Sequence, residues 1–382
     1  MSTIEHHSII IVGAGLSGLY VAWMLQQEKR EHDVLLLESR ERIGGRILSP
    51  PSPQSPQIDN PTDSCIDMGP AWVWPDFQPR LKHLVSTLNL PLFKQNTRGD
   101  RLYELDAKTV ERYTDQSSHE SSYRIVGGAF QLIQALQADL SDSSMHLNTR
   151  VTLLEKPASE SQTTLTIHAQ QNSTSTKHPI KYSADTIILA LPPRLGRQTI
   201  AFKPVLDKEV LQLWQDTPTW MAGHCKMVFI YDTPFWREQN LSGEVFSSYG
   251  PLSEIYDGSP ANESYYALTS FVKLNSHQRK QIGFDQLKKM CMTQLQRLFG
   301  DASQHVVEIL IKDWSTDEYT TTKADLTSSA QHPRYPAHLS RSMWDEQIIL
   351  AGSEVAREHG GYIEGALESA EEAIQILSNK HE

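Results

Sequence analysis

Residues 8–46 read SIIIVGAGLSGLYVAWMLQQEKREHDVLLLESRERIGGR, and this stretch decides the fold. Ser8 to Val12 form a short apolar run, which is typical of a buried parallel strand. The apolar residues that follow repeat with the spacing of one helical face: Leu16, Leu19, Tyr20 and Trp23. A second apolar run, DVLLLE at 33–38, predicts the next strand. A strand, a glycine turn, a helix and a strand in this order predict a βαβ unit that binds a dinucleotide.

The turn GAGLSG carries the phosphate-binding chemistry. Gly13 permits the tight turn, Gly15 lets the backbone approach a pyrophosphate, and Gly18 allows the helix to pack closely on the strand. The helix N-terminus offers unpaired N–H groups to phosphate oxygens. Glu38 ends the second strand, where a carboxylate binds the ribose hydroxyls, and this disfavours NADP. The predicted cofactor-binding residues of this unit are Gly13, Ala14, Gly15, Leu16, Ser17, Gly18 and Glu38.

An extension, ESRERIGGR, follows directly at 38–46. Its arginines supply guanidinium groups and its glycine pair a second tight turn for the other side of a pyrophosphate. The residues predicted to bind the cofactor here are Ser39, Arg40, Gly44, Gly45 and Arg46. Nicotinamide dehydrogenases do not usually carry this extension. With it, the chain resembles the flavin-containing amine oxidase superfamily, as a monoamine oxidase-like, bacterial-type soluble member, and the resemblance implies FAD as the cofactor.

The resemblance recurs along the chain in the family's order. IDMGPAWVW at 66–74 resembles the segment beside the flavin, and RIVGGAFQLIQAL at 124–136, followed by HLNTRVTLLEK, resembles the glycine–helix–strand unit near the adenine. TIILALPPRL at 186–195 matches the strand and double proline that close the second flavin-domain segment, and DWSTDEYTT at 313–321 resembles the segment that leads back under the flavin. The C-terminus from IILAGSEVAREHGGY onward resembles the closing strand and helix. The resemblance implies further cofactor contacts from Met68, Gly69, Val151, Trp314, Gly352, Ser353, Glu354, Gly361 and Ile363.

Lys226 is the residue that the resemblance singles out for mechanism. GHCKMVFIYDTPFW at 223–236 resembles the family segment in which a lysine inside a strand holds a water on flavin N5. A charge in an apolar strand must find water or a polar partner. The alternative interpretation is an edge-strand lysine that points to solvent. His224 lies two residues earlier, on the same strand face, and we expect it to line the substrate cavity.

Tyr362 is the second expected catalytic residue. It precedes the last helix, whose N-terminal dipole is expected to stabilise negative charge on the flavin. In the family this tyrosine and a second aromatic residue form a cage for the amine, but the second position falls on Ala324. Trp72 or Trp74 completes the cage, or the cage is absent. Where the mitochondrial enzymes bond the flavin to a cysteine, this chain has Lys323, so we expect noncovalent FAD.

These segments predict an α/β (α+β) fold. It consists of a Rossmann-like FAD-binding domain of the glutathione-reductase and amine-oxidase type and a discontinuous substrate domain with a mixed sheet. The predicted FAD-binding domain comprises residues 1–79, 124–200 and 322–382, and the substrate-binding domain comprises 80–123 and 201–321. A chain of 382 residues is long enough for two such cores.

The composition fits a cytoplasmic enzyme. Lys and Arg number 35 and Asp and Glu 46, so the net charge is −11, which disfavours nucleic acid and mildly favours cationic ligands. Glycines interrupt the N-terminal apolar run, which argues against a signal peptide or membrane span. The three cysteines show neither metal-ligand spacing nor a disulfide framework, so we expect no metal. His6 and His7 are expected to be unstructured.

The expected activity is oxidation of an amine C–N bond by hydride transfer to flavin N5. Oxygen is the acceptor, and the products are hydrogen peroxide and an imine that hydrolyses to an aldehyde or keto acid and ammonia. An L-amino acid oxidase is an alternative, with Arg80, Arg101 and Arg124 as candidate partners of the substrate carboxylate. A desaturase or porphyrinogen-oxidase-like flavoprotein and a non-catalytic flavin-binding protein are the others. The expected partners are a small-molecule amine and oxygen, with no nucleic acid and no membrane; the oligomeric state is open.

Overall fold

The computed structural model describes residues 4–28, 33–52, 65–114, 117–141, 144–158, 163–172, 177–327, 331–336 and 339–380. The chain forms two compact units. Unit 1 comprises Met1–Ile47, Leu132–Trp220 and Glu318–Glu382, and unit 2 comprises Leu48–Gln131 and Met221–Asp317.

The boundaries of the two units fall at different residues from the boundaries of the predicted domains. Segments 48–79 and 124–131 cluster with unit 2, because residues near Ile66 pack on the unit-2 sheet. Residues 201–220 cluster with unit 1, where residues 201–203 extend its sheet. Which segments contact the cofactor stays a prediction.

Unit 1 is built on one large sheet, with strand order β11-β8-β9-β10-β1-β2-β7; β18 pairs with β10 and β17. Its strands are β1 (Glu5–Val12), β2 (Val34–Leu37), β7 (Met145–His146), β8 (Thr149–Glu155), β9 (Leu165–Asn172), β10 (Lys177–Leu189), β11 (Ala201–Lys203), β17 (Ser342–Met343) and β18 (Ile348–Leu350). Its helical segments are α1 (Leu16–Gln27), α4 (Pro193–Thr199), α5 (Lys208–Gln215), η6 (Asp325–Thr327), η7 (Ser353–Val355) and α9 (Ile363–Lys380). β1 runs parallel to β2 and β10, as the predicted βαβ unit requires.

The first strand is longer than predicted. β1 begins at Glu5, and His6 and His7 pair with Ser183 and Ala184 of β10. His7 is buried. The expectation that these histidines are unstructured is therefore wrong, because β10 extends far enough along the sheet to pair with them.

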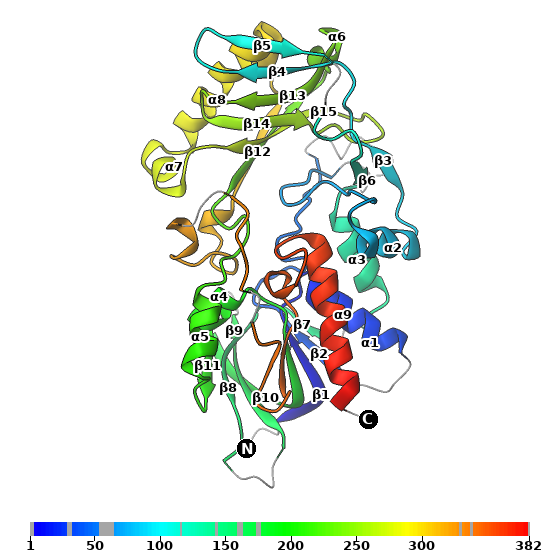
Figure 1. The fold of residues 1–382 in the computed structure, drawn as a ribbon, viewed down its shortest axis with the longest axis vertical. Coiled ribbons are helices and arrows are strands. Elements are labelled where there is room, and N and C mark those ends of the chain that lie inside the picture. The colour runs from blue at the N-terminus through cyan, green and yellow to red at the C-terminus, as the bar shows by residue number, and fades with distance from the viewer. Residues whose placement is uncertain are drawn as a thin grey trace. The chain divides into compact units, whose positions relative to one another are not determined.

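α1 and α9 pack against each other beside the parallel strands (Figure 1). Ser17 of α1 joins them, since its hydroxyl donates to the Ala366 carbonyl of α9 at 2.9 Å and also contacts the Ala351 carbonyl. α1 is consequently buried on more than its predicted face: Val21 and Leu25 are buried as well. In the described part of the chain, no helix is long and apolar enough to cross a membrane.

Unit 2 contains a mixed sheet in the order β16-β12-β15-β14-β13-β4-β5 and a two-stranded sheet, β3-β6. Its strands are β3 (Leu92–Lys94), β4 (Asp100–Glu104), β5 (Val110–Tyr113), β6 (Tyr123–Ile125), β12 (Cys225–Tyr231), β13 (Leu241–Ser247), β14 (Leu252–Asp257), β15 (Tyr266–Val272) and β16 (Glu308–Asp313). Its helical segments are α2 (Pro79–Thr87), α6 (Phe235–Glu238), α7 (Ser276–Ile282), α8 (Phe284–Phe299), η4 (Asp301–Gln304) and η5 (Trp314–Thr316), and α3 (Phe130–Ala138) leads into unit 1.

β12 contributes to two separate cores because its side chains alternate between the faces of the sheet. Met227 and Phe229 belong to the core that includes Leu287 of α8, on one face. Val228 belongs to a second core with Ile66. Since β12 is hydrogen-bonded to both β15 and β16, it is an interior strand, and Lys226 lies on the face of Val228.

Candidate active site and cofactor cradle

The glycine turn of unit 1 is shaped by two close approaches. Gly13 has φ +109°, and a Cβ there would lie 2.6 Å from the Ala190 carbonyl oxygen. A Cβ on Gly18 would lie 2.0 Å from the Gly13 carbonyl oxygen. Gly15 differs, because the nearest atom to a Cβ placed on it would be Gly45 Cα at 4.0 Å. The space in front of Gly15 is therefore open, as close approach of a ligand requires.

Glu38 closes this turn from the end of β2. Its Oε2 accepts from the Ala14 N–H and its Oε1 from the Arg40 N–H, both at 2.8 Å. Arg40 also donates to Thr320 at 2.8 Å. Gly44 donates to the Ala14 carbonyl at 2.7 Å, so the two glycine turns are hydrogen-bonded to each other. We call residues 13–18, 38–40 and 44–46 the cofactor cradle; Ser39 lies within it.

Arg46 is engaged by the C-terminal segment. Its guanidinium donates to both Glu354 oxygens, at 2.5 and 3.0 Å, and to Ser353 Oγ at 2.9 Å. Glu354 is fully buried, and Gly352 precedes the pair without space for a side chain beside Leu191. These contacts join the GGR turn to η7; contact of the guanidinium with a pyrophosphate remains a prediction.

Tyr362 carries an exposed ring, 43% accessible, at the start of α9. Its ring stacks on His332, with centroids 4.8 Å apart and planes 8° apart. Trp220 lies edge-on to His332 at 4.9 Å, and His332 Nε2 donates to the Gly360 carbonyl at 2.8 Å. A Cβ on Gly361 would lie 2.6 Å from Trp220 Cβ, so this turn is tightly enclosed. Sequence reasoning missed His332 and Trp220.

The cofactor cradle fits an FAD pyrophosphate and ribose. α1 begins at Leu16, its N-cap Gly15 has no side chain, and its first turn has no acid, so its N–H groups are available to phosphate oxygens. Glu38 is a buried carboxylate with lone pairs left for ribose hydroxyls. Val151 is buried on β8, and Ile363 is half-buried at the start of α9.

In unit 2, Lys226 is the centre of a second set of predicted residues. Lys226 is 3% exposed, and its Nζ donates to the Gly69 carbonyl at 2.9 Å. The Trp72 and Phe271 rings each lie 5.8 Å from Nζ. The solvent-facing edge-strand alternative is therefore wrong. Next to Gly69, the Met68 carbonyl accepts from Trp314 Nε1 at 3.1 Å.

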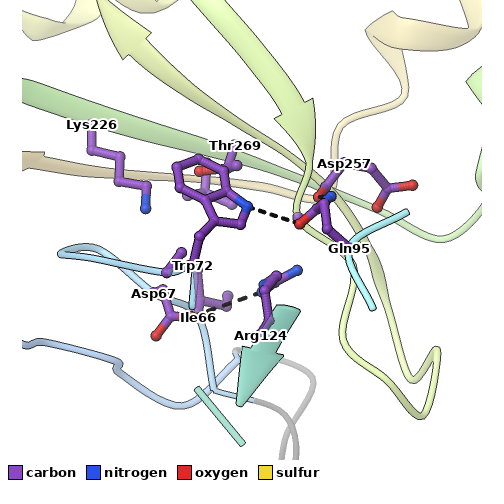
Figure 2. A pocket seen from close by; sticks show the side chains of 11 residues that line it. Ile66, Asp67, Trp72, Gln95, Arg124, Lys226, Asp257 and Thr269 are labelled. Carbon is purple, nitrogen blue, oxygen red and sulfur yellow. Dashed lines mark hydrogen bonds and ion pairs between the residues drawn. The ribbon is translucent and has the colours of Figure 1, made fainter. Parts of the chain in front are cut away.

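Lys226 faces a small cavity (Figure 2). The residues that line it, the Lys226 cavity below, are Ile66, Asp67, Ala71, Trp72, Gln95, Arg124, Lys226, Val228, Asp257, Gly258 and Thr269. Trp72 Nε1 donates to Gln95 Oε1 at 2.9 Å. Burial lowers the pKa of Lys226 to about 8, although Asp67 raises it and Arg124 lowers it further. The cavity therefore holds a lysine that changes charge near neutral pH.

The remaining predicted substrate-lining residues lie outside the cavity lining. Trp74 packs its ring against Trp72 and His119, at 6.3 and 5.6 Å. His224 precedes β12, and its ring lies edge-on to Phe271 at 6.4 Å. Burial lowers the pKa of His224, and the charge of nearby Arg279 lowers it further. Whether these residues touch substrate remains a prediction.

Comparisons with known proteins agree with this organisation. The family model for flavin containing amine oxidoreductase matches residues 92–376, and the model for an NAD(P)-binding Rossmann-like domain matches 11–88. The chain is 23% identical to putrescine oxidase of Kocuria rosea, over 96% of this chain and 94% of that protein. It is 27% identical to the probable flavin-containing monoamine oxidase A of Dictyostelium discoideum, over 67% of this chain, and spans about half, 53%, of that protein's length.

A solved structure of putrescine oxidase bound to putrescine shares the fold, with TM-score 0.77 and 21% identity over 98% of this chain and all of that one. The fold and the family model define the class as FAD-dependent amine oxidases. The chain belongs to the flavin containing amine oxidoreductase family, whose model covers most of its length.

Proposed function

We propose that this chain oxidises amines without a carboxylate group, using noncovalently bound FAD and oxygen, and that Lys226 and Tyr362 act on the reacting groups. The observation that carries the proposal is the buried Lys226 on an interior strand beside the Gly69 carbonyl. Held by the cofactor cradle, FAD would supply two-electron oxidation: the amine would lose a hydride from its α-carbon as its nitrogen lone pair forms the C=N bond, and the two electrons would pass to oxygen, which with two protons becomes hydrogen peroxide.

The chain's own residues then have separate tasks. One N–H group of the Lys226 ammonium donates to the Gly69 carbonyl, so two N–H groups remain to donate to water. The rings of Trp72 and Phe271 keep bulk water away from this ammonium group. The exposed face of Tyr362 supplies aromatic surface for the neutral amine. Orientation of the amine supplies much of the rate acceleration.

Arg124 bears on the amino acid alternative, because it is the member of the three candidate arginines that lines the Lys226 cavity. Its Nη1 already donates to the Ser259 carbonyl at 2.9 Å, and Nη2 lies 3.9 Å from Asp67 Oδ2. A guanidinium with a carboxylate beside it attracts a second carboxylate less strongly. We therefore favour amines over amino acids as substrates.

Noncovalent binding and a cytoplasmic location are part of the proposal. Cys225 and Cys291 lie in the unit-2 core, where burial raises the pKa of each thiol to about 12. Such thiols are inert toward bond formation with a flavin. Cys65, Cys225 and Cys291 form no disulfide with one another, and reduced cysteines suit a reducing compartment.

The test is an anaerobic titration of the FAD-loaded protein, followed by its visible spectrum. Monoamines, diamines and L-amino acids are added in turn. Bleaching by amines and not by amino acids supports the proposal. Bleaching by amino acids alone would select the alternative, and a flavin that no compound bleaches would point to a desaturase-like or non-catalytic flavoprotein.

A further inference from the structure

Three buried polar atoms beside Lys226 have no hydrogen-bond partner within the described residues. They are Asp67 Oδ2, Arg124 Nε and Thr269 Oγ1. All three residues line the Lys226 cavity, and Figure 2 shows Asp67 and Arg124 on the side of the cavity opposite the sheet that carries Lys226 and Thr269. Buried polar atoms in native proteins nearly always have a partner, so three around one cavity indicate a bound group.

The other atoms of these side chains hold them in place. Asp67 Oδ1 accepts from Ser49 Oγ at 2.6 Å and from the Ala129 N–H at 2.8 Å. Arg124 Nη1 donates to the Ser259 carbonyl. Asp67 Oδ2 lies 3.9 Å from Arg124 Nη2, which is beyond hydrogen-bond length. The two side chains are therefore close enough to form an ion pair but are not hydrogen-bonded to each other.

The interior space beside these atoms is about that of one water molecule. A water donates two hydrogen bonds and accepts two. Asp67 Oδ2 and the Thr269 hydroxyl accept, while Arg124 Nε and one of the two remaining Lys226 protons donate. A substrate amine is too large for this space.

We propose that Asp67, Arg124 and Thr269 hold a buried water against Lys226, and that Asp67, through this water, is the counter-charge and proton partner of Lys226. Asp67 is thus a positioning residue for the lysine. The inference rests on the proposed role of Lys226 in the oxidase reaction.

Other charged side chains in the register of Lys226 have polar partners of their own. Lys312 lies opposite Lys226 in the pairing of β12 with β16, and its Nζ donates to Asp317 at 3.0 Å. On the other side of β12, Phe271 of β15 lies opposite Lys226, and Glu254 of β14 lies opposite Phe271. The Glu254 Oε2 accepts from Tyr256 at 2.8 Å.

His224 lies two residues before Lys226 and is disfavoured as a cation by burial, which lowers its pKa. Asp257, which also lines the cavity, is paired with Arg237 at 2.8 Å. Asp67 and Arg124 act on the pKa of the lysine in opposite directions. Removing either charge should therefore shift the protonation of Lys226, with opposite signs.

The first experiment needs no amine. The FAD-loaded protein is reduced by light, mixed with oxygen, and its reoxidation rate is followed from pH 6 to 10. D67N should lower the midpoint of the lysine-dependent limb by about one pH unit, which is about a tenfold change in the protonated fraction at a fixed pH. R124Q should raise it. D345N changes a carboxylate that is 91% exposed in unit 1 and should leave the profile unchanged.

The second experiment observes the water directly, in crystal structures of the FAD-loaded wild type, T269V and T269S. A water within hydrogen-bond distance of Asp67 and Thr269 is expected in the wild type and in T269S, and not in T269V. These variants keep the inference testable if D67N fails to fold, since Asp67 also contacts Ala129.

The role of Lys226 and the role of the groups around it can be tested separately. If K226M keeps the wild-type pH profile, the role of Lys226 is wrong and the inference with it. If K226M removes the limb but D67N and R124Q shift it in the same direction or not at all, the inference alone is overturned. An empty cavity in the wild-type crystal structure also overturns it.

Discussion

The buried charges of the two units are paired very differently. In unit 1, the Arg46 guanidinium is bound by Glu354 and Ser353 at hydrogen-bond distances. In unit 2, Lys226 donates to one carbonyl, and Asp67 Oδ2 has no hydrogen-bond partner within the described residues. A fully paired buried charge fixes structure, whereas an under-paired one keeps capacity for a ligand or a proton. We therefore expect Arg46 to hold the GGR turn, and the sparse pairing of Lys226 supports its proposed role in the chemistry.

The largest expected effect comes from breaking the fully paired charge. E354A leaves Arg46 without its carboxylate and should lower the free energy of unfolding by about 3–5 kcal/mol. D345A is the matched control, because Asp345 forms a surface pair with Lys156 and should cost about 0–1 kcal/mol. Denaturant unfolding of both variants checks the difference. Equal costs would mean that the Arg46 pair does not hold this region together.

The under-paired charge of Lys226 should make the free energy of unfolding depend on pH. Burial lowers the pKa of Lys226 from 10.5 to about 8, so the unfolded chain binds the proton more tightly than the folded one. Between pH 8 and 10.5 the free energy of unfolding of the wild type should therefore rise relative to K226M, by about 2–4 kcal/mol in total. Unfolding midpoints of both proteins across this range provide the measurement. A constant difference would show that Lys226 is not perturbed.

Two glycines of the cofactor cradle separate folding from cofactor binding. G18A places a methyl group against the Gly13 carbonyl and should destabilise the protein by about 1–3 kcal/mol. G15A has space for its methyl group, so it should fold with near wild-type stability and bind FAD at least about tenfold more weakly, because that space is where the pyrophosphate approaches. FAD titration and unfolding of both variants test this. If G15A binds FAD normally, the cradle is misplaced.

The smallest expected effect concerns the ring stacked on Tyr362. H332A removes the stack and the hydrogen bond to Gly360 and should weaken amine binding by up to about tenfold, corresponding to about 0.5–1.5 kcal/mol. H332F keeps an aromatic face and should recover most of the affinity. The dissociation constant for amine in anaerobic flavin reduction is the readout. No change in H332A would remove His332 from the substrate site.

Local patterns predicted the parts of the fold that depend on local physics. The glycine turn after β1 requires small residues and a positive φ at Gly13, and the glycines in the sequence predict both. The family resemblance of the segment around Lys226, and not its apolar neighbours alone, predicted that the lysine is buried, and β12 is an interior strand. The last helix, α9, carries apolar residues at helical spacing, among them Ala366, Leu367, Ala370 and Ile374, and all four are buried.

The partners of the charged groups could not be predicted in the same way. Arg46 and Glu354 are 308 residues apart, and no periodicity links them. Thr269 faces the Lys226 cavity only because β15 pairs with β12 in one register, in which Val228 lies opposite Thr269. Such contacts depend on sheet order and register, which the sequence pattern of a single strand does not contain.

The central claim is that Lys226 acts in the chemistry, and one comparison of two lysines tests it most directly. K226M and K312M change lysines that lie opposite each other on adjacent strands, but Lys312 is paired with Asp317. Reoxidation of the light-reduced, FAD-loaded proteins by oxygen is followed by stopped flow, with thermal unfolding as a check on folding. K226M is expected to slow reoxidation about 100-fold, while K312M should stay within about threefold of the wild type. Equal rates in K226M and wild type, with both proteins folded and FAD-loaded, would show that Lys226 takes no part in the reaction with oxygen.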